Sequence, residues 1–211
     1  MLRTRLAVFV SGGGTNLQAL IDAQKEGKLK SGEIVLVISS SPRAYALERA
    51  RINNIPSVVM QRKGFSCQEE YEFQLRKVLR EHNIQLIVLA GFMNILSESF
   101  TSCYPKRILN IHPSLIPSFC GKGFYGLKVH EAALSYGVKV TGATVHFVNE
   151  IPDGGEILLQ KAVEVLSGDT PEILQRRVME QAEWIILPEA AETVSWEISA
   201  KGNSYERIRD L

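Results

Sequence analysis

Short apolar runs alternate along the chain with longer stretches in which apolar residues recur at helical spacing. Continuous apolar runs of this kind are typical of strands that are covered on both faces. They occupy residues 6–10, 33–40, 56–60, 85–91 and 107–112. Between them, Leu17, Leu20 and Ile21 recur as on one face of a helix. We therefore expect helices over residues 15–29, 42–54, 67–81 and 97–104.

This alternation predicts an α/β fold with a Rossmann-like, mostly parallel twisted sheet flanked by helices. The pattern changes after a further helix over residues 128–136, because the strands expected at 140–149 and 156–165 form a C-terminal antiparallel hairpin. A long final helix begins near Pro171, and Pro188 is expected to kink or split it. No linker interrupts the chain, so we predict a single domain over residues 1–211.

Composition and charge exclude several classes of protein. Hydrophobic residues make up 45% and charged residues 22% of the chain, and the formal net charge is +1 with no basic block. These values give no reason to expect a nucleic-acid partner or a membrane partner. No apolar stretch approaches the ~20 residues of a membrane span, so we expect a cytoplasmic protein. The spacing of the three cysteines predicts reduced thiols and no metal site.

A glycine-rich stretch follows the first apolar run, and it reads SGGGTN over residues 11–16. Backbone amides at the start of a helix suit a phosphate, and the best donors here are Gly14, Thr15 and Asn16. The dinucleotide fingerprint fails because Leu17 stands where the third glycine belongs. A single phosphate monoester fits better, and a simple tight turn before a helix is the alternative.

Asn110 and His112 stand two residues apart at the end of the fifth apolar run. Residues at this spacing project from one face of a strand, and ligands bind beyond the carboxyl ends of parallel strands. An amide and an imidazole that converge there can bind an oxyanion and transfer a proton. Asp153 is a candidate carboxylate to orient the histidine, although Asp-Gly is also a common hairpin turn. A structural histidine remains the alternative at this point.

Several segments in order resemble the glycinamide ribonucleotide transformylases, which belong to the folate-dependent formyltransferases. They read VFVSGGGTNLQALI, LAGFMNIL, LNIHPSLIP, VTGATVHFV and PDGGEILLQ. The resemblance implies transfer of a formyl group from 10-formyltetrahydrofolate, as co-substrate, to glycinamide ribonucleotide in purine biosynthesis. It also implies a phosphate-binding half over about residues 1–106 and a catalytic and folate-binding half over about residues 107–211.

The resemblance assigns roles to particular residues. It makes Asn110, His112 and Asp153 the catalytic group, through oxyanion stabilisation and proton transfer. It assigns substrate binding and folate binding to two further sets. The substrate set is Gly14, Thr15, Asn16 and Glu183, and the folate set is Gln68, Met93, Asn94, Ile95, Leu96 and Asn110.

The chain departs from the family pattern at a few positions. Asn94 and Gln68 stand where members of the family often have arginine, and the spacing before Glu183 is one residue longer. The sequence leaves open the role of Lys122 and the choice between a monomer and a homodimer. A formyltetrahydrofolate deformylase, which uses water as the nucleophile, is one alternative function. A non-catalytic folate- or nucleotide-binding module is the other.

Overall fold

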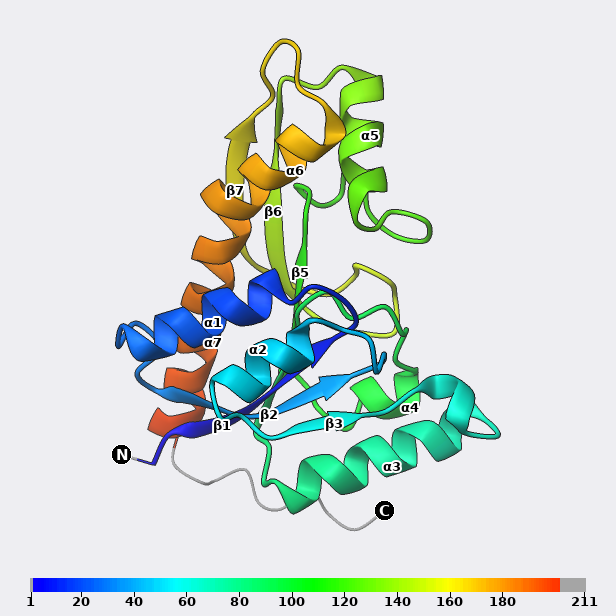
Figure 1. Cartoon of the computed structure of the whole chain (residues 1–211), viewed down its shortest axis with the longest axis vertical. Helices are drawn as coiled ribbons and strands as arrows, with labels where there is room; N and C mark the ends of the chain where they lie inside the picture. Colours follow the sequence, from blue (N-terminus) through cyan, green and yellow to red (C-terminus); the bar gives the residue numbers. More distant parts are fainter. Residues whose placement is uncertain (1, 202–211) are drawn as a thin grey trace.

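One sheet of seven strands runs through the computed structural model, which describes residues 2–201. The strand order is β3-β2-β1-β4-β5-β6-β7. The strand bounds are β1 Thr4–Val10, β2 Gly32–Ser39, β3 Ser57–Val59, β4 Leu86–Leu89, β5 Ile108–His112, β6 Val140–Phe147 and β7 Ile157–Glu164. The first five strands in this order pair in parallel, whereas β5 with β6 and β6 with β7 pair antiparallel. The predicted fold class is thereby confirmed (Figure 1).

Helices cover both faces of this sheet. Their bounds are α1 Thr15–Lys25, α2 Ala46–Ile52, α3 Gln68–Glu81, α4 Glu98–Thr101, α5 Leu127–Tyr136, α6 Pro171–Val178 and α7 Trp184–Ala200. Alternate residues of β1 point to opposite faces. Leu6 and Val8 join the core under α1, α2 and α7, whereas Ala7 and Phe9 join the core under α3 and α4. Each face of the central strand is therefore buried, as its unbroken apolar run predicts.

The parallel pairing fixes where a ligand can bind. β1 and β5 both pair with β4 in parallel, so all three strands end at the same edge of the sheet. β1 ends at Val10, directly before the glycine-rich stretch, and β5 ends at His112. The two candidate regions of the sequence, about 100 residues apart by their numbering, therefore lie along one edge.

Several helix termini follow from single residues. Ser97 caps α4 by accepting a hydrogen bond from the backbone N–H of Phe100, as expected. Gly27 follows the last turn of α1 with φ +70°, as expected of a glycine stop. The predicted start of the second helix at Pro42 is wrong, because α2 begins at Ala46. The N–H of Ala46 donates instead to the Gly12 carbonyl, so α2 starts where it meets the glycine-rich turn.

The C-terminal helix is interrupted before the proline and continues through it. A π-helical segment, η2 (Met179–Glu183), separates α6 from α7, and Pro188 lies inside α7. The expected break at Pro188 is thus displaced towards the N-terminus. A proline ring in a regular helix clashes with the carbonyl four residues earlier, which here belongs to Trp184. The wider π turn ends just before that residue.

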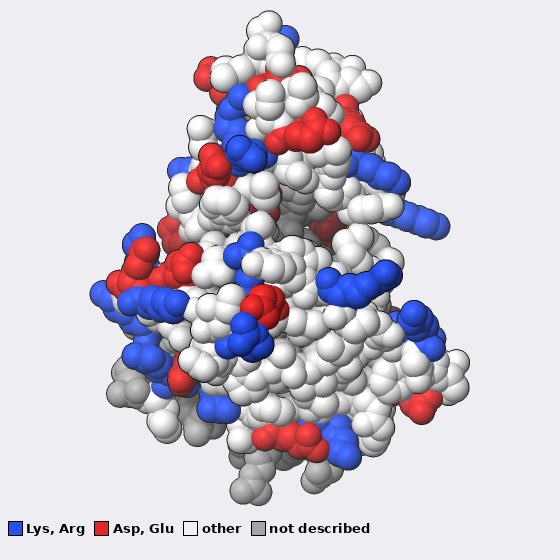
Figure 2. All heavy atoms as spheres, viewed as in Figure 1, with Lys and Arg blue, Asp and Glu red and all other residues white. Residues whose placement is uncertain are grey.

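The surface carries both signs of charge, interspersed over the face in Figure 2, in keeping with the near-neutral net charge. This face is hollowed between the upper part, with α5 and α6, and the lower part, with α2 and α3 (Figures 1 and 2). Within residues 2–201, no helix is long and apolar enough to cross a membrane.

Candidate active site

Asn110 and His112 project together from the end of β5, next to the antiparallel strand β6. Cross-strand pairing sets Asn110 opposite His146 and His112 opposite Thr144. His112 is 4% exposed. The imidazole is therefore almost fully enclosed at the end of β5.

Asp153 reaches these two residues from the connection between β6 and β7. Its Oδ1 lies 3.4 Å from His112 Nδ1, a contact that becomes an ion pair when the ring is protonated. The same oxygen lies 3.5 Å from Asn110 Nδ2. Asp153 has φ +55°, a turn conformation that aspartate tolerates better than most residues. The structure thus brings together the three side chains that the sequence singles out.

His146 fixes the orientation of the Asn110 amide. Its Nδ1 lies 2.9 Å from the Phe147 carbonyl, which can only accept, so Nδ1 carries the hydrogen. In the neutral ring Nε2 is then an acceptor, and it takes a hydrogen bond of 3.0 Å from Asn110 Nδ2. Burial lowers the pKa of His146, with smaller opposing effects from the Phe147 carbonyl and Asp153. A neutral His146 therefore turns the amide nitrogen of Asn110 towards the site.

The loop after β5 covers the catalytic group. His112 Nε2 donates a hydrogen bond of 2.9 Å to the Phe119 carbonyl. The N–H of Gly121 donates to Asp153 Oδ2 at 2.7 Å. Two of the three side chains are thus bonded to the backbone of one loop. A substrate that uses them has to exchange these bonds for its own.

His130, on α5, is a third buried histidine near the site. It is fully buried, and neither ring nitrogen has a hydrogen-bond partner in the described part of the chain. Burial, together with a smaller effect of the charge of a protonated His112, lowers its pKa to about 4. His130 is therefore neutral near pH 7.

The glycine-rich turn between β1 and α1 presents free backbone amides. Gly14 is the N-cap of α1, and no side chain in residues 2–201 caps this terminus. No acidic residue lies in its first turn. At Gly12 and Gly13 an added Cβ would meet nothing within 4 Å, so the turn is open there. These features suit an anion.

The side chains of Thr15 and Asn16 do not point to the open side of this turn. Asn16 Nδ2 donates to Glu183 Oε2 at 2.6 Å, and Thr15 Oγ1 lies 3.8 Å from Met179 Sδ. In this conformation neither side chain is placed to add a hydrogen bond to an anion at the turn. Both are engaged by η2, and the backbone amides remain as donors.

Glu183 is the buried partner of the glycine-rich turn. It is 6% exposed, and burial raises its pKa to about 7, although the hydrogen bond from Asn16 opposes this. A carboxylate in such a position can accept hydrogen bonds from a ligand hydroxyl or amine. The structure thus brings Glu183 to Asn16 from the other end of the chain.

The segment after β4 forms a partly exposed apolar rim. Met93 is 54% and Ile95 is 66% exposed, whereas Leu96 is buried. The amide of Asn94 donates to the Tyr71 hydroxyl at 3.2 Å. The N–H of Met93 donates to Ser11 Oγ at 2.9 Å, which connects this segment to the end of β1.

Gln68 holds the same segment from α3. Its Nε2 donates to the Ile95 carbonyl at 3.2 Å and to Glu72 Oε1 at 2.6 Å. Glu72 is buried and also accepts from the backbone N–H of Ser97 at 2.7 Å. The uncharged side chains of Gln68 and Asn94 are thus both engaged in fixing this segment.

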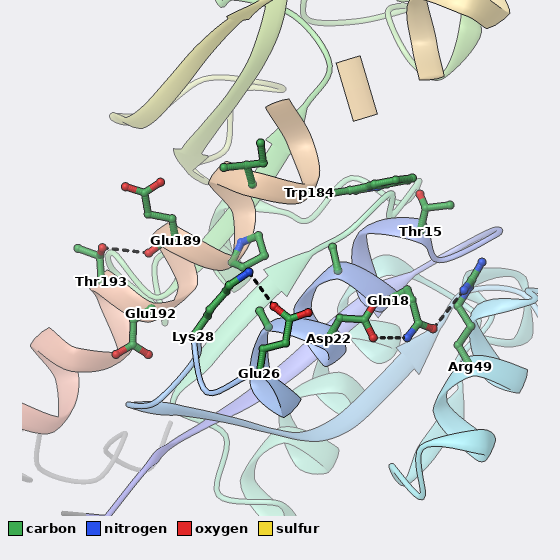
Figure 3. A pocket seen from close by; sticks show the side chains of 14 residues that line it. Thr15, Gln18, Asp22, Glu26, Lys28, Arg49, Trp184, Glu189, Glu192 and Thr193 are labelled. Atoms are coloured by element: carbon green, nitrogen blue, oxygen red, sulfur yellow. Dashed lines mark hydrogen bonds and ion pairs between the residues drawn. The ribbon is translucent and has the colours of Figure 1, made fainter. Parts of the chain in front are cut away.

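A surface pocket of about 670 Å³ lies away from His112, between α1 and α7. Thr15, Gln18 and Arg49 line one side of it, and Trp184 and Glu189 line the other (Figure 3). Of the residues predicted from the sequence, only Thr15 lines this pocket. Within residues 2–201, no group of three or more His, Cys, Asp or Glu side chains is placed to hold a metal ion.

The sheet order, the open glycine-rich turn and the group of Asn110, His112 and Asp153 define an α/β protein with a candidate site at the carboxyl ends of its parallel strands. The model of the Formyl transferase family matches residues 4–191. The chain belongs to this family. Its relatives include proteins named phosphoribosylglycinamide formyltransferase and trifunctional purine biosynthetic proteins.

Among solved structures, glycinamide ribonucleotide transformylase 1 from Symbiobacterium toebii has a TM-score of 0.86 and 40% identity, over 92% of this chain and 89% of that one. The phosphoribosylglycinamide formyltransferase from Brucella melitensis has a TM-score of 0.84 and 42% identity, over 92% of this chain and 96% of that one.

Two curated relatives are longer than this chain. The chloroplastic phosphoribosylglycinamide formyltransferase of Arabidopsis thaliana is 42% identical over 85% of this chain and 61% of its own length. The human trifunctional purine biosynthetic protein adenosine-3 is 44% identical over 92% of this chain and 18% of its own length. The chain thus spans about three fifths of the plant relative and less than a fifth of the human one.

The sequence did not point to several residues of this site. Phe119 and Gly121 act through their backbone, so their side chains give no signal. Ser11 and Glu72 act as connectors between elements that are distant in sequence. His146 carries a signal, because it shares a strand face with Thr144, but only the β5–β6 register places it opposite Asn110.

Proposed function

We propose that this chain transfers a formyl group from 10-formyltetrahydrofolate to the amine of N1-(5-phospho-D-ribosyl)glycinamide, a step of purine biosynthesis. The observation that carries the proposal is the convergence of Asn110, His112 and Asp153 at the end of β5, within 3.5 Å of one another through Asp153 Oδ1. The names of the matched relatives support the choice of acceptor.

The proposed chemistry is acyl transfer between two nitrogen atoms. The neutral amine of the acceptor attacks the formyl carbon, a C–N bond forms, and the carbonyl electrons move to oxygen. Asn110 Nδ2 and protonated His112 Nε2 donate hydrogen bonds to that oxyanion. The tetrahedral intermediate then collapses, the bond to the folate nitrogen breaks, and that nitrogen takes up a proton. Protonated His112 gives its Nε2 proton to that folate nitrogen, and the neutral ring then takes up the proton that the attacking amine loses.

Asp153 serves as the partner of the imidazole. Its Oδ1 faces His112 Nδ1, so the positive charge that the ring gains has a carboxylate at 3.4 Å. Two nearby charges of opposite sign in a buried site attract more strongly than in water. Before reaction, His112 Nε2 exchanges the Phe119 carbonyl for the formyl oxygen, because one N–H cannot serve both at full strength.

The glycine-rich turn and Glu183 hold the acceptor. The open amides of Gly14, Thr15 and Asn16 bind the phosphate at the start of α1. Glu183 accepts a hydrogen bond from a ribose hydroxyl or from the substrate amine.

The formyl donor lies along the apolar rim. Met93 and Ile95 offer exposed apolar surface to the flat ring of the folate, and the backbone of residues 93–96 offers hydrogen bonds. Gln68 and Asn94 keep this segment in place. Because neither is charged, we expect weaker attraction to the carboxylates of the folate tail than arginine would give.

The test is the loss of the formyl group from 10-formyltetrahydrofolate, followed by absorbance with and without glycinamide ribonucleotide. We expect turnover only when the ribonucleotide is present. Turnover without it would mean that water is the nucleophile and that the chain is a deformylase. No turnover in either case, with both ligands bound, would mean a binding module.

A further inference from the structure

Two successive carbonyls of the glycine-rich turn are bonded to α2. The N–H of Ala46 donates to the Gly12 carbonyl at 3.1 Å. Arg49 Nε donates to the Gly13 carbonyl at 2.8 Å. The packing is close, because a Cβ added at Gly14 would lie 2.6 Å from Ala46 Cβ. The first turn of α2 thus holds one side of the glycine-rich turn.

Arg49 is itself fixed in this place by further contacts. Its Nη1 donates to Gln18 Oε1 at 3.1 Å, across to α1 (Figure 3). Its guanidinium carbon lies 5.2 Å from the centre of the Tyr45 ring, within range of a cation–π contact. No carboxylate in residues 2–201 forms an ion pair with Arg49, so its charge is not neutralised by a neighbour in that part of the chain.

These bonds determine where the amides of the turn point. In a trans peptide the carbonyl and the following N–H point in opposite directions, and the one cis bond in residues 2–201 is Ile116–Pro117. Because the carbonyls of Gly12 and Gly13 point to α2, the N–H groups of Gly13 and Gly14 point away from it. No acceptor in the described part of the chain bonds either N–H. Successive free amides of this kind form a cradle for an anion.

A second polar group at the same place lacks a partner. Asn16 is 8% exposed, and its Oδ1 has no hydrogen-bond partner among the described residues, although its Nδ2 is bonded to Glu183. A buried acceptor without a donor is unfavourable unless a ligand or water supplies one. The first turn of α1 therefore presents two free amides and a free acceptor together.

We propose that Arg49 is a positioning residue for the phosphate end of the substrate. It holds the Gly13 carbonyl towards α2 and thereby directs the Gly13 and Gly14 amides at the phosphate, while its charge adds a favourable field. This inference rests on the proposed function, in which that turn binds the phosphate of the acceptor. It enlarges the donor set predicted from the sequence by the amide of Gly13.

The test compares Arg49→Gln with Arg51→Gln, which removes the same charge from the same helix. Arg51 is exposed and paired with Glu48 at 2.7 Å, away from the turn. For Arg49→Gln we expect KM for glycinamide ribonucleotide to rise about 10-fold. We expect kcat to stay within about twofold and KM for the formyl donor to stay unchanged. Arg51→Gln should match the wild type in all three values.

Arg49→Lys refines the test. The lysine ammonium can donate to the Gly13 carbonyl, but it lacks the planar guanidinium geometry that bonds the Gly13 carbonyl and Gln18 at the same time. The KM of Arg49→Lys for glycinamide ribonucleotide should lie between the values of the wild type and of Arg49→Gln. An unchanged KM in Arg49→Gln, or a fall in kcat with unchanged KM, would overturn the proposal. If Arg49→Gln does not fold, a wild-type KM in Arg49→Lys together with its wild-type stability would overturn it as well.

Binding of ribose 5-phosphate, measured by calorimetry, separates this inference from the proposed function because it requires no turnover. Affinity should fall about 10-fold in Arg49→Gln relative to the wild type and to Arg51→Gln. That result would support the inference even if no formyl transfer were found. Equal affinity in all proteins, or no binding to any of them, would overturn it.

Discussion

The ends of β1 and β5 lie along one edge of the sheet but are built from different parts of the chain. Beyond β1 the donors are backbone amides of a glycine-rich turn, and they are free. Beyond β5 the groups are the side chains of Asn110, His112 and Asp153, and each is bonded within the protein. The first region is open to a ligand as it stands, whereas the second has to exchange partners.

This difference fits the two tasks that we propose. An anchor for a phosphate needs several fixed donors and no change of protonation, which backbone amides provide. Formyl transfer needs a group that gains and loses a proton, which only a titratable side chain provides. Variants at the end of β5 should therefore affect kcat. Variants at the end of β1 should affect KM for the acceptor or the stability of the fold.

The largest effect is expected for His112→Ala. The loss of the group that both donates to the oxyanion and transfers the proton should lower kcat about 1,000-fold. KM for either substrate should change by no more than about threefold. The control is His82→Ala, because His82 lies at the end of α3 and its ring bonds the Val78 carbonyl. A kcat within tenfold of the wild type would show that His112 has no catalytic role.

Glu183 should make stability depend on pH. Its pKa is raised to about 7 in the folded chain, so the folded state holds its proton more tightly than the unfolded state. The stabilising contribution of Glu183 to the free energy of unfolding is fully present below the ordinary pKa of about 4.5. It is lost as the pH rises through about 7. The difference corresponds to at most roughly 3 kcal/mol of unfolding free energy.

Glu183→Gln should remove this dependence. Relative to the wild type, the variant should gain stability as pH rises from 5 to 8, as measured by urea unfolding at each pH. Glu180→Gln is the matched control, because Glu180 lies in the same segment but is exposed. Parallel stability curves for the wild type and Glu183→Gln would contradict the burial argument.

A smaller effect on catalysis is expected for His146. Without its acceptor, the amide of Asn110 is free to turn away, and a misdirected donor lowers kcat about 10- to 100-fold. His146→Gln can supply both an acceptor and a donor, so it should retain more activity than His146→Ala. Equal loss in the two variants would mean that His146 acts through packing instead of through Asn110.

The smallest effects are expected for Gly13 and Gly14, the two adjacent glycines beyond the end of β1. Gly14→Ala should cost about 1–3 kcal/mol of stability, because φ is +71° and the new methyl would meet Ala46. Gly13→Ala should change stability by less than about 0.5 kcal/mol, since nothing lies within 4 Å of the added carbon. It should instead raise KM for the acceptor, because the methyl occupies open space beside the amides.

Thermal unfolding and steady-state kinetics together measure both glycine variants. A large loss of stability in Gly13→Ala with unchanged KM would mean that the turn is only structural. That outcome would remove the contrast between the end of β1 and the end of β5.

Much of this fold could be predicted from the sequence because it depends on local patterns. The apolar runs of β1 and β4 and the cap at Ser97 are readable one segment at a time. Two features cannot be predicted in this way, because each depends on a partner far along the chain. They are the π segment at Met179–Glu183 and the start of α2 at Ala46.

In the candidate site, too, local spacing predicts some features and contacts between distant residues determine the others. The spacing of Asn110 and His112 gave their common face, whereas the position of Asp153 rested on resemblance until the structure brought it to 3.4 Å from His112. The orientation of Asn16 towards Glu183 was missed, because the contact joins residues 167 positions apart. Backbone contacts, such as that of Phe119 with His112, leave no mark in a sequence.

The most direct test of the account follows a carbon-13 label in the formyl group of 10-formyltetrahydrofolate, with glycinamide ribonucleotide present. The account predicts that the wild-type chain places the label in a formamide on the ribonucleotide, and that His112→Ala does so about 1,000 times more slowly. Label released as formate, or transferred equally fast by both proteins, would contradict it.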